Sequence, residues 1–409
     1  MTTALIIGGG IAGTVTAMAL HRAGIDAVVH EASPHVADAG AIDTGAFLVV
    51  AANGLEALRT IDAHGPVLDH SFATGHVDFI SDTGKRLGRK PISGSADGGP
   101  GSRTIKRATL VRVLREEAAR RGVRIEYGKR LLAAHTSPDG TVVGCFADGG
   151  RAMADVLIGA DGLHSLTRRT IDAASARPRY TGQQTVCGYA REVPAPPDPD
   201  TYTMIFGKQA FFGCTTAPDG GIWWFANAPA PELPPAELAA VTPEQWREKL
   251  TGLFAEDRTA AAGIIGATGE DIIATGGYDI VSTPTWSSEA MVIVGDAAHA
   301  CAPNAAQGAS LAMEDGVVLA KCLRDLRHPR SAFAAYEGLR RARVEKVARS
   351  SADLARRTAP GPVKRALRDA TLPRRLDRAG GAAATDWLTG YRIDWDQPVE
   401  GETAVRGRR

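Results

Sequence analysis

Apolar and polar positions at the start of the chain follow the order expected of a nucleotide-binding unit. Residues 4–7 are an apolar run, the turn Gly8-Gly9-Gly10-Ile11-Ala12-Gly13 follows, and residues 14–23 have the spacing of a buried helix. Residues 26–30 are a second apolar run. The order of strand, Gly-x-Gly-x-x-Gly turn, helix and strand predicts a βαβ unit of a Rossmann-like α/β fold.

The same periodicities predict further elements along the chain. Helices are expected at 51–63, 109–121, 310–324 and 332–355, and strands at 124–126, 142–146 and 154–160. The segment 183–276 differs, because it has a strand-like pattern, concentrates aromatic residues and is punctuated by prolines. We therefore expect a second, β-rich unit interleaved with the first.

These patterns divide the chain into three parts. A discontinuous nucleotide-binding domain is expected over 1–75, 101–180 and 277–330, and a substrate-binding β-sheet domain over 76–100 and 181–276. A C-terminal helical segment is expected over 331–409. Its basic residues are interpreted as a solvent-facing helix surface, and they include Lys364, Arg365, Arg368, Arg374 and Arg375.

Composition narrows the class of partner. The chain has 409 residues, enough for more than one domain. Its formal net charge of +1 is too small to attract nucleic acid or an anionic membrane electrostatically. Its cysteines show no paired spacing, so neither a disulfide framework nor a metal site is indicated. No signal peptide or membrane span is recognised. We expect a cytoplasmic monomer or homodimer that acts on a small molecule.

The glycine-rich turn carries the first candidate binding residues. Gly8 and Gly10 let the backbone approach a pyrophosphate, and Gly13 lets the helix pack close to the strand. The helix start, with Ile11 and Ala12, offers free amides and partial positive charge to the phosphates. The second strand is followed by a further pair of candidates, Glu31 and Ala32, where the carboxylate is placed to accept hydrogen bonds from the adenosine ribose.

A second nucleotide segment lies nearly three hundred residues later. Gly295 and Asp296 follow the apolar run 291–294, and Pro303, Gly308 and Ala309 follow them. A nicotinamide site needs no such segment, whereas FAD does, because its flavin half must also be held. Asp296 is interpreted as an acceptor for sugar-alcohol hydroxyls, with a helix cap as the alternative. Gly308 and Ala309 begin a helix whose amides could stabilise negative charge on a reduced flavin.

With these motifs in order, the chain resembles the class A flavoprotein monooxygenases, the p-hydroxybenzoate hydroxylase-like family. The resemblance rests on Gly8 to Gly13 with Glu31, on Asp161-Gly162, and on Gly295-Asp296 with Pro303 and Gly308. It implies a Rossmann-like FAD-binding domain of that type, an interleaved β-sheet substrate domain and C-terminal helices. It also implies noncovalent FAD, with Arg107 near the flavin. Asp161 is then involved both in FAD binding and in reduction of the flavin by NADPH or NADH.

Two positions depart from the family pattern. Ala305-Ala306 stands where glycine or leucine is common, and Cys301 stands where a small residue is frequent. We interpret Cys301 as a packed small residue. Two polar residues follow the later motifs. His299 is either a proton relay near the flavin or a hydrogen-bonded support for its loop. Ser165 is expected to cap the next helix.

The resemblance further implies a monooxygenase that consumes NAD(P)H and O2 and hydroxylates an aromatic substrate through a flavin C4a-hydroperoxide. A phenolic or polycyclic natural product is the expected substrate, with Phe206, Phe211 and Trp224 as pocket residues. No catalytic acid or base is required of the protein. The alternatives are Baeyer-Villiger oxidation, epoxidation or reduction on the same fold, a flavin-containing metabolite-binding protein, and an NAD-dependent dehydrogenase.

Overall fold

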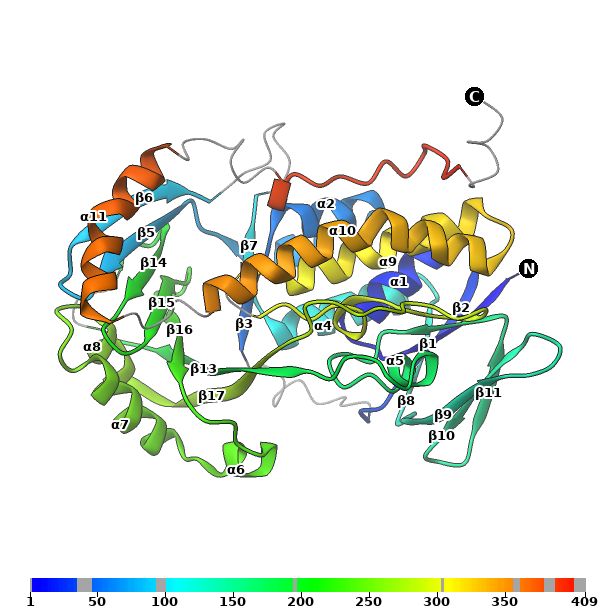
Figure 1. Ribbon diagram of the computed structural model, residues 1–409, viewed down its shortest axis with the longest axis horizontal. Coiled ribbons are helices and arrows are strands. Elements are labelled where there is room, and N and C mark those ends of the chain that lie inside the picture. The colour runs from blue at the N-terminus through cyan, green and yellow to red at the C-terminus, as the bar shows by residue number, and fades with distance from the viewer. Residues whose placement is uncertain are drawn as a thin grey trace.

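The computed structural model describes residues 2–34, 46–92, 101–193, 197–302, 305–355, 361–378 and 387–400. Two larger sheets organise these residues (Figure 1). This mixed α/β architecture confirms the predicted fold class.

The first larger sheet is parallel and carries the glycine turn. Its order is β18-β12-β1-β2-β8, and every neighbouring pair runs parallel. The strands are β1 (Thr3–Ile7), β2 (Asp26–Glu31), β8 (Arg124–Tyr127), β12 (Val156–Gly159) and β18 (Met291–Ile293). Since β1, β12 and β18 are adjacent, the segments that follow these three strands emerge at the same edge of the sheet.

Helices pack against this sheet and against one another. They are α1 (Ile11–Arg22), α2 (Ala52–Thr60), α3 (Gly65–Asp69), α4 (Arg107–Arg120), α5 (Leu166–Ile171), α9 (Gly308–Asp325) and α10 (Pro329–Ala355). A Cβ on Gly316 of α9 would lie 2.7 Å from the Thr16 hydroxyl of α1, so glycine permits this close helix crossing. Figure 1 shows α10 lying along α9.

The second larger sheet has seven strands in the order β17-β13-β16-β15-β14-β5-β6. They are β5 (His76–Ser81), β6 (Arg86–Pro91), β13 (Arg179–Ala190), β14 (Thr201–Phe206), β15 (Phe211–Thr216), β16 (Ile222–Pro229) and β17 (Thr268–Asp279). All pairs are antiparallel except β14 with β5. One face packs on α7 (Pro243–Phe254) and α8 (Ala261–Gly266) in a separate apolar core.

Smaller elements complete the described chain. They are the sheet β3 (Phe47–Val50), β7 (Arg103–Lys106) and β4 (Phe72–Ala73), the sheet β11 (Arg151–Ala154), β10 (Val142–Phe146) and β9 (Leu131–Thr136), the 3-10 turn Gly295–Ala297, α6 (Pro235–Ala240) and α11 (Pro362–Arg378). None of the described helices is both long enough and apolar enough to cross a bilayer. The predicted helices and strands are present, with ends shifted by a few residues, and the division into domains stays a prediction.

Candidate functional site

The glycine turn between β1 and α1 leaves an open space above its backbone. Gly8 has a φ of +101°, and a Cβ there would lie 2.4 Å from the carbonyl oxygen of Ala160. A Cβ on Gly10, in contrast, would meet no atom of the described residues within 4 Å. The first turn of α1 carries no acidic residue. Open space beside uncompensated helix amides fits a pyrophosphate.

A cavity of about 1800 Å³ extends from this turn to the seven-stranded sheet. The turn and β2 line it with Gly8, Gly10, Ile11, Ala12, Glu31 and Ala32. The later motifs line it with Arg107, Asp161, Gly162, Asp296, Gly308 and Ala309. The fold therefore brings predicted cofactor residues from distant segments to one cavity, and their contacts with FAD stay a prediction.

Two predicted cofactor residues lie behind the cavity wall. A Cβ on Gly13 would lie 1.9 Å from the carbonyl oxygen of Gly8, so this position allows the helix and turn to pack together. Gly295 has a φ of +60° and a Cβ there would lie 3.0 Å from Ala12 Cβ. Both glycines shape the backbone that other residues present to the cavity. Pro303 lies outside the described residues.

Glu31 is held by backbone amides and by an arginine. Its carboxylate accepts hydrogen bonds from the Gly9 amide at 2.7 Å and the Ser33 amide at 2.8 Å. Arg115 Nη2 lies 3.2 Å from the same carboxylate, and Arg115 Nε donates to the Gly9 carbonyl at 2.7 Å. Burial raises the pKa of Glu31, but these hydrogen bonds and Arg115 outweigh it and lower the pKa. Glu31 therefore stays ionised at the cavity edge.

The sequence reasoning missed Arg115, although a signal was present. Arg107 and Arg115 both belong to α4 and stand two turns apart, so they share one helix face.

We expect Arg115→Gln to weaken FAD binding about tenfold, because Gly9 and Glu31 lose a charged hydrogen-bond partner. The measurement is the dissociation constant of FAD by flavin fluorescence. Arg112→Gln is the matched control, since Arg112 of the same helix pairs with Glu116 in an exposed position, and equal affinities of the two variants would contradict the role given to Arg115.

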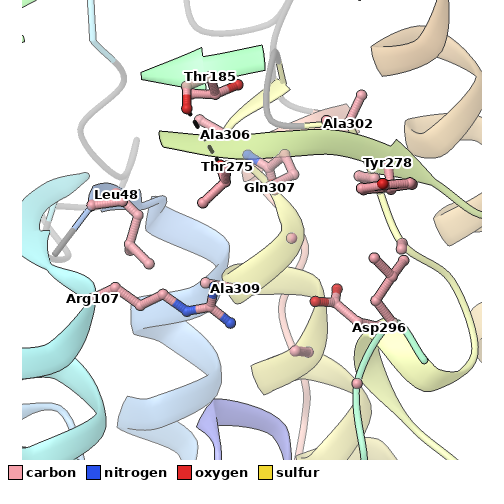
Figure 2. Close-up of a pocket in the computed structure, with 18 of the residues that line it drawn as sticks. Leu48, Arg107, Thr185, Thr275, Tyr278, Asp296, Ala302, Ala306, Gln307 and Ala309 are labelled. Atoms are coloured by element: carbon pink, nitrogen blue, oxygen red, sulfur yellow. Dashed lines mark hydrogen bonds between the residues drawn. The ribbon is translucent and has the colours of Figure 1, made fainter. Parts of the chain in front are cut away.

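Arg107 and Asp296 lie on opposite sides of the start of α9, and both side chains point into the cavity (Figure 2). Within the described part of the chain, no hydrogen bond is made by the Asp296 carboxylate. Burial raises the pKa of Asp296, and the opposite effect of Arg107 and His299 offsets this only in part. A carboxylate that faces a cavity without a protein partner fits a ligand that bears hydroxyl groups, as the flavin side chain does.

The backbone conformation of Ala306 shows why glycine suits this position, where the chain departs from the family pattern. Ala306 has a φ of 50°, in the left-handed region that favours glycine. Alanine can adopt this conformation at a cost of about 1 kcal/mol. Cys301 also lines the cavity, and burial raises its pKa to about 12, so its sulfur is a neutral thiol.

The Asp161-Gly162 turn is tied to the Gly295-Asp296 turn. Asp161 accepts hydrogen bonds from the Ser165 hydroxyl at 2.5 Å and the Thr167 amide at 2.9 Å. Ser165 in turn accepts from the Arg168 amide at 2.9 Å, which confirms that it caps α5. The buried Arg168 guanidinium donates to the carbonyl oxygens of Ala297 and Leu163, and so it joins the two turns.

A buried ion network supports the second turn from behind. Asp315 of α9 accepts from the Gly295 amide at 2.9 Å and pairs with His299 Nε2 at 2.6 Å. Arg340 of α10 donates to Asp315 at 2.8 Å and lies 2.5 Å from Glu314, with all three side chains fully buried. Burial raises the pKa of Asp315, but His299 and Arg340 lower it to about 2. His299 is thus a hydrogen-bonded support for its loop in this structure.

The seven-stranded sheet forms the other side of the cavity, and β5, β13, β14 and β16 contribute alternate residues to it. Phe206 and Phe211 line the cavity, as does Phe225. The prediction that Trp224 lines it is wrong, because Trp224 points to the opposite face. There it is fully buried, stacked on Phe212 at 5.8 Å, with Nε1 donating to Thr268 at 2.9 Å. Strand alternation separates the two sets of side chains, and the helices α7 and α8 cover the Trp224 face.

The interpretation of the basic C-terminal stretch as a solvent-facing surface is wrong for part of α11. Arg368 lines the cavity and its side chain is only 16% exposed, whereas Lys364 lies at the cavity edge and is exposed, as the interpretation expects. The Arg368 guanidinium lies 4.8 Å from the Phe206 ring centroid, and Nε donates to Asp369 at 2.7 Å. A Cβ on Gly88 of β6 would lie 2.6 Å from Leu376, so α11 packs directly on the sheet and closes one end of the cavity.

Comparisons with known proteins agree with this geometry. The chain matches the family model described as FAD binding domain over residues 1–351. It is 31% identical over 343 residues to the aurachin C monooxygenase/isomerase of Stigmatella aurantiaca, across 83% of this chain and 85% of that protein. It is 32% identical over 399 residues to the 3-amino-4-hydroxybenzoate 2-monooxygenase PtnB3 of Streptomyces platensis, across 94% and 95%.

A solved structure shares the fold. HpxO of Klebsiella pneumoniae, complexed with FAD and uric acid, aligns with a TM-score of 0.81 at 23% identity. The alignment covers 92% of this chain and 95% of that chain.

Proposed function

Since the chain belongs to the FAD binding domain family and is an FAD-dependent monooxygenase, we propose that it hydroxylates an aromatic substrate, with NADPH or NADH as reductant and dioxygen as the oxygen source. The observation that carries this proposal is the continuous cavity between the glycine turns and the aromatic face of the seven-stranded sheet. Two similar proteins support the substrate class, because the name of one specifies 3-amino-4-hydroxybenzoate and the structure of the other holds uric acid, and both are ring compounds.

Each part of the cavity wall has a separate task in this proposal. The glycine turn and Glu31 bind the adenosine diphosphate half of the cofactor, and Asp296 and Arg107 orient its flavin half. FAD, when bound, supplies the redox chemistry and the activation of oxygen. The start of α9 has no acidic residue in its first turn, so its amides favour negative charge at the adjoining ring position.

The sheet side of the cavity presents apolar surface to the substrate. Phe206, Phe211 and Phe225 present rings to it, and Met204 and Cys187 add apolar surface. An aromatic-lined wall favours a flat organic substrate and would limit the access of water to the reacting centre. The chain therefore binds, orients and desolvates, and the reacting groups come from the cofactor, the reductant and dioxygen.

The test begins with the visible spectrum of the purified protein before and after denaturation. We expect a flavin spectrum that denaturation releases into solution. NADPH or NADH oxidation in air should then rise when a suitable aromatic compound is added, and the product should gain one oxygen atom by mass spectrometry. A gain of two hydrogens, or ligand binding with no reductant consumed in any case, would contradict the proposed hydroxylation.

A further inference from the structure

One row of side chains crosses the cavity face of the seven-stranded sheet. The strand registers pair Phe206 with Phe211, Phe211 with Asn227, Asn227 with Thr185, and Thr185 with Thr275. All five residues line the cavity. The row is therefore aromatic at one end, on β14 and β15, and polar at the other, on β16, β13 and β17.

The polar end lies toward the nucleotide half of the cavity. Figure 2 shows Thr185 and Thr275 on the side where Ala306 and Gln307 precede α9. The aromatic end lies toward α11, where Arg368 covers Phe206. The next row of the sheet is apolar, since Met204, Phe225 and Cys187 also line the cavity. The polar end is thus a group of hydrogen-bonding atoms on the cavity face, beside apolar surface.

The hydrogen bonds within the row leave a defined set of donors and acceptors. The Thr185 hydroxyl donates to Asn227 Oδ1 at 2.8 Å, and the Thr275 hydroxyl donates to the Thr185 carbonyl at 3.4 Å. Both hydroxyl oxygens can still accept, and the Asn227 Nδ2 amide can donate. A phenolic hydroxyl complements this set, because it accepts from the amide and donates to a threonine oxygen.

None of the five residues is charged, and the Arg368 guanidinium over Phe206 already pairs with Asp369, so the polar end of the row provides no counter-ion for a carboxylate. We propose that this row selects the substrate, and that the substrate is an aromatic compound with a neutral hydroxyl group. Its hydroxyl is bound by Asn227, Thr185 and Thr275, and its apolar part lies against Phe211 and Phe206. This inference rests on the proposed function, because it assigns the substrate of the same cavity.

Binding to the FAD-loaded full-length protein tests the row without turnover. The probes are 2-naphthol, 4-hydroxyquinoline and 4-hydroxybenzamide, each compared with its O-methyl ether, and the readout is the change in flavin absorbance during titration. We expect at least one hydroxyl compound to bind at least tenfold tighter than its ether, because the ether cannot donate to a threonine oxygen.

The variants are Thr275→Val and Asn227→Leu. Each should weaken binding of the hydroxyl compound about tenfold and leave binding of the ether unchanged. Thr203→Val is the matched control, since Thr203 is on β14 of the same sheet but pairs with Cys214 on the opposite face, and it should bind like the wild type. Bound FAD per chain reports whether each variant is folded, and Thr275→Val suffices for the test if Asn227→Leu is not.

The proposal is overturned if the ethers bind as tightly as the hydroxyl compounds, or if no hydroxyl compound perturbs the flavin. It is also overturned if Thr275→Val has no effect, or if it weakens both members of a pair equally. Hydroxyl-dependent binding without NAD(P)H oxidation would count against the proposed hydroxylation and leave the role of the row intact, so the two failures are distinguishable.

Discussion

Replacement of Gly10 by valine should abolish FAD binding and leave the apoprotein close to wild type in stability. Among the residues that the structure describes, none has an atom within 4 Å of a Cβ at Gly10, so the larger side chain enters the space assigned to the pyrophosphate. The loss of contacts with both phosphates, added to the steric block, should raise the dissociation constant of FAD by more than about a thousandfold. The measurements are FAD binding by fluorescence quenching and the free energy of unfolding of the apoprotein.

Two other glycines provide the comparison. A Cβ on Gly252 of α7 would likewise meet no described atom within 4 Å, and Gly252 is exposed, so Gly252→Val should leave FAD affinity unchanged. Gly13→Ala, in contrast, should destabilise the apoprotein itself, because its Cβ would lie 1.9 Å from the Gly8 carbonyl oxygen. If Gly10→Val retained wild-type affinity for FAD, the pyrophosphate would have to bind elsewhere.

Replacement of Arg340 by leucine should lower the free energy of unfolding by about 3–5 kcal/mol. Arg340 is fully buried and contacts the carboxylates of both Glu314 and Asp315, so its loss leaves two buried negative charges with fewer partners. Urea denaturation measures the effect. Arg349→Leu is the control on the same helix, because the Arg349 side chain is 62% exposed and its pair with Glu345 should contribute less than about 1 kcal/mol.

The pH dependence of the same network has a definite sign. The pKa of Asp315 falls from 3.8 to about 2 in the folded protein. A carboxyl group with a lowered folded pKa contributes stability that is present above its unfolded pKa and is lost as the pH falls toward the folded pKa. The pKa of Asp315 should rise in Arg340→Leu, so the stability gap from the wild type should narrow as the pH drops below about 4. A gap that is constant with pH would show that Arg340 acts by packing alone.

The sequence predicted the elements and motifs that depend on local spacing. The glycine turn, Glu31, Asp161 and Asp296 could be found because each follows an apolar strand at a fixed offset, and the parallel sheet then places strand ends together. Phe206 and Phe211 were chosen from their aromatic character and do line the cavity.

The errors and omissions have physical causes of a different kind. Strand alternation separates Trp224 from its neighbours, but only packing by α7 and α8 decides which set of side chains is buried. Arg115, Arg168 and Arg340 were missed because their partners are remote in sequence, as the pair of Arg340 and Asp315 illustrates. The basic pattern of α11 gives no sign that Arg368 meets Phe206, since that contact depends on where the helix docks.

The strand order of the seven-stranded sheet has a consequence for how the protein forms. Strands β5 and β6 end by Pro91, but the parallel partner of β5 is β14, at Thr201–Phe206. At ordinary translation speeds, on the order of 5–20 residues per second, the ribosome needs roughly 6–25 s to progress from β5 to β14. During that interval β5 has no neighbour on that side, and closing so long a loop is slow. The cavity face of the seven-stranded sheet therefore cannot be complete until β17, at Thr268–Asp279, has been synthesised.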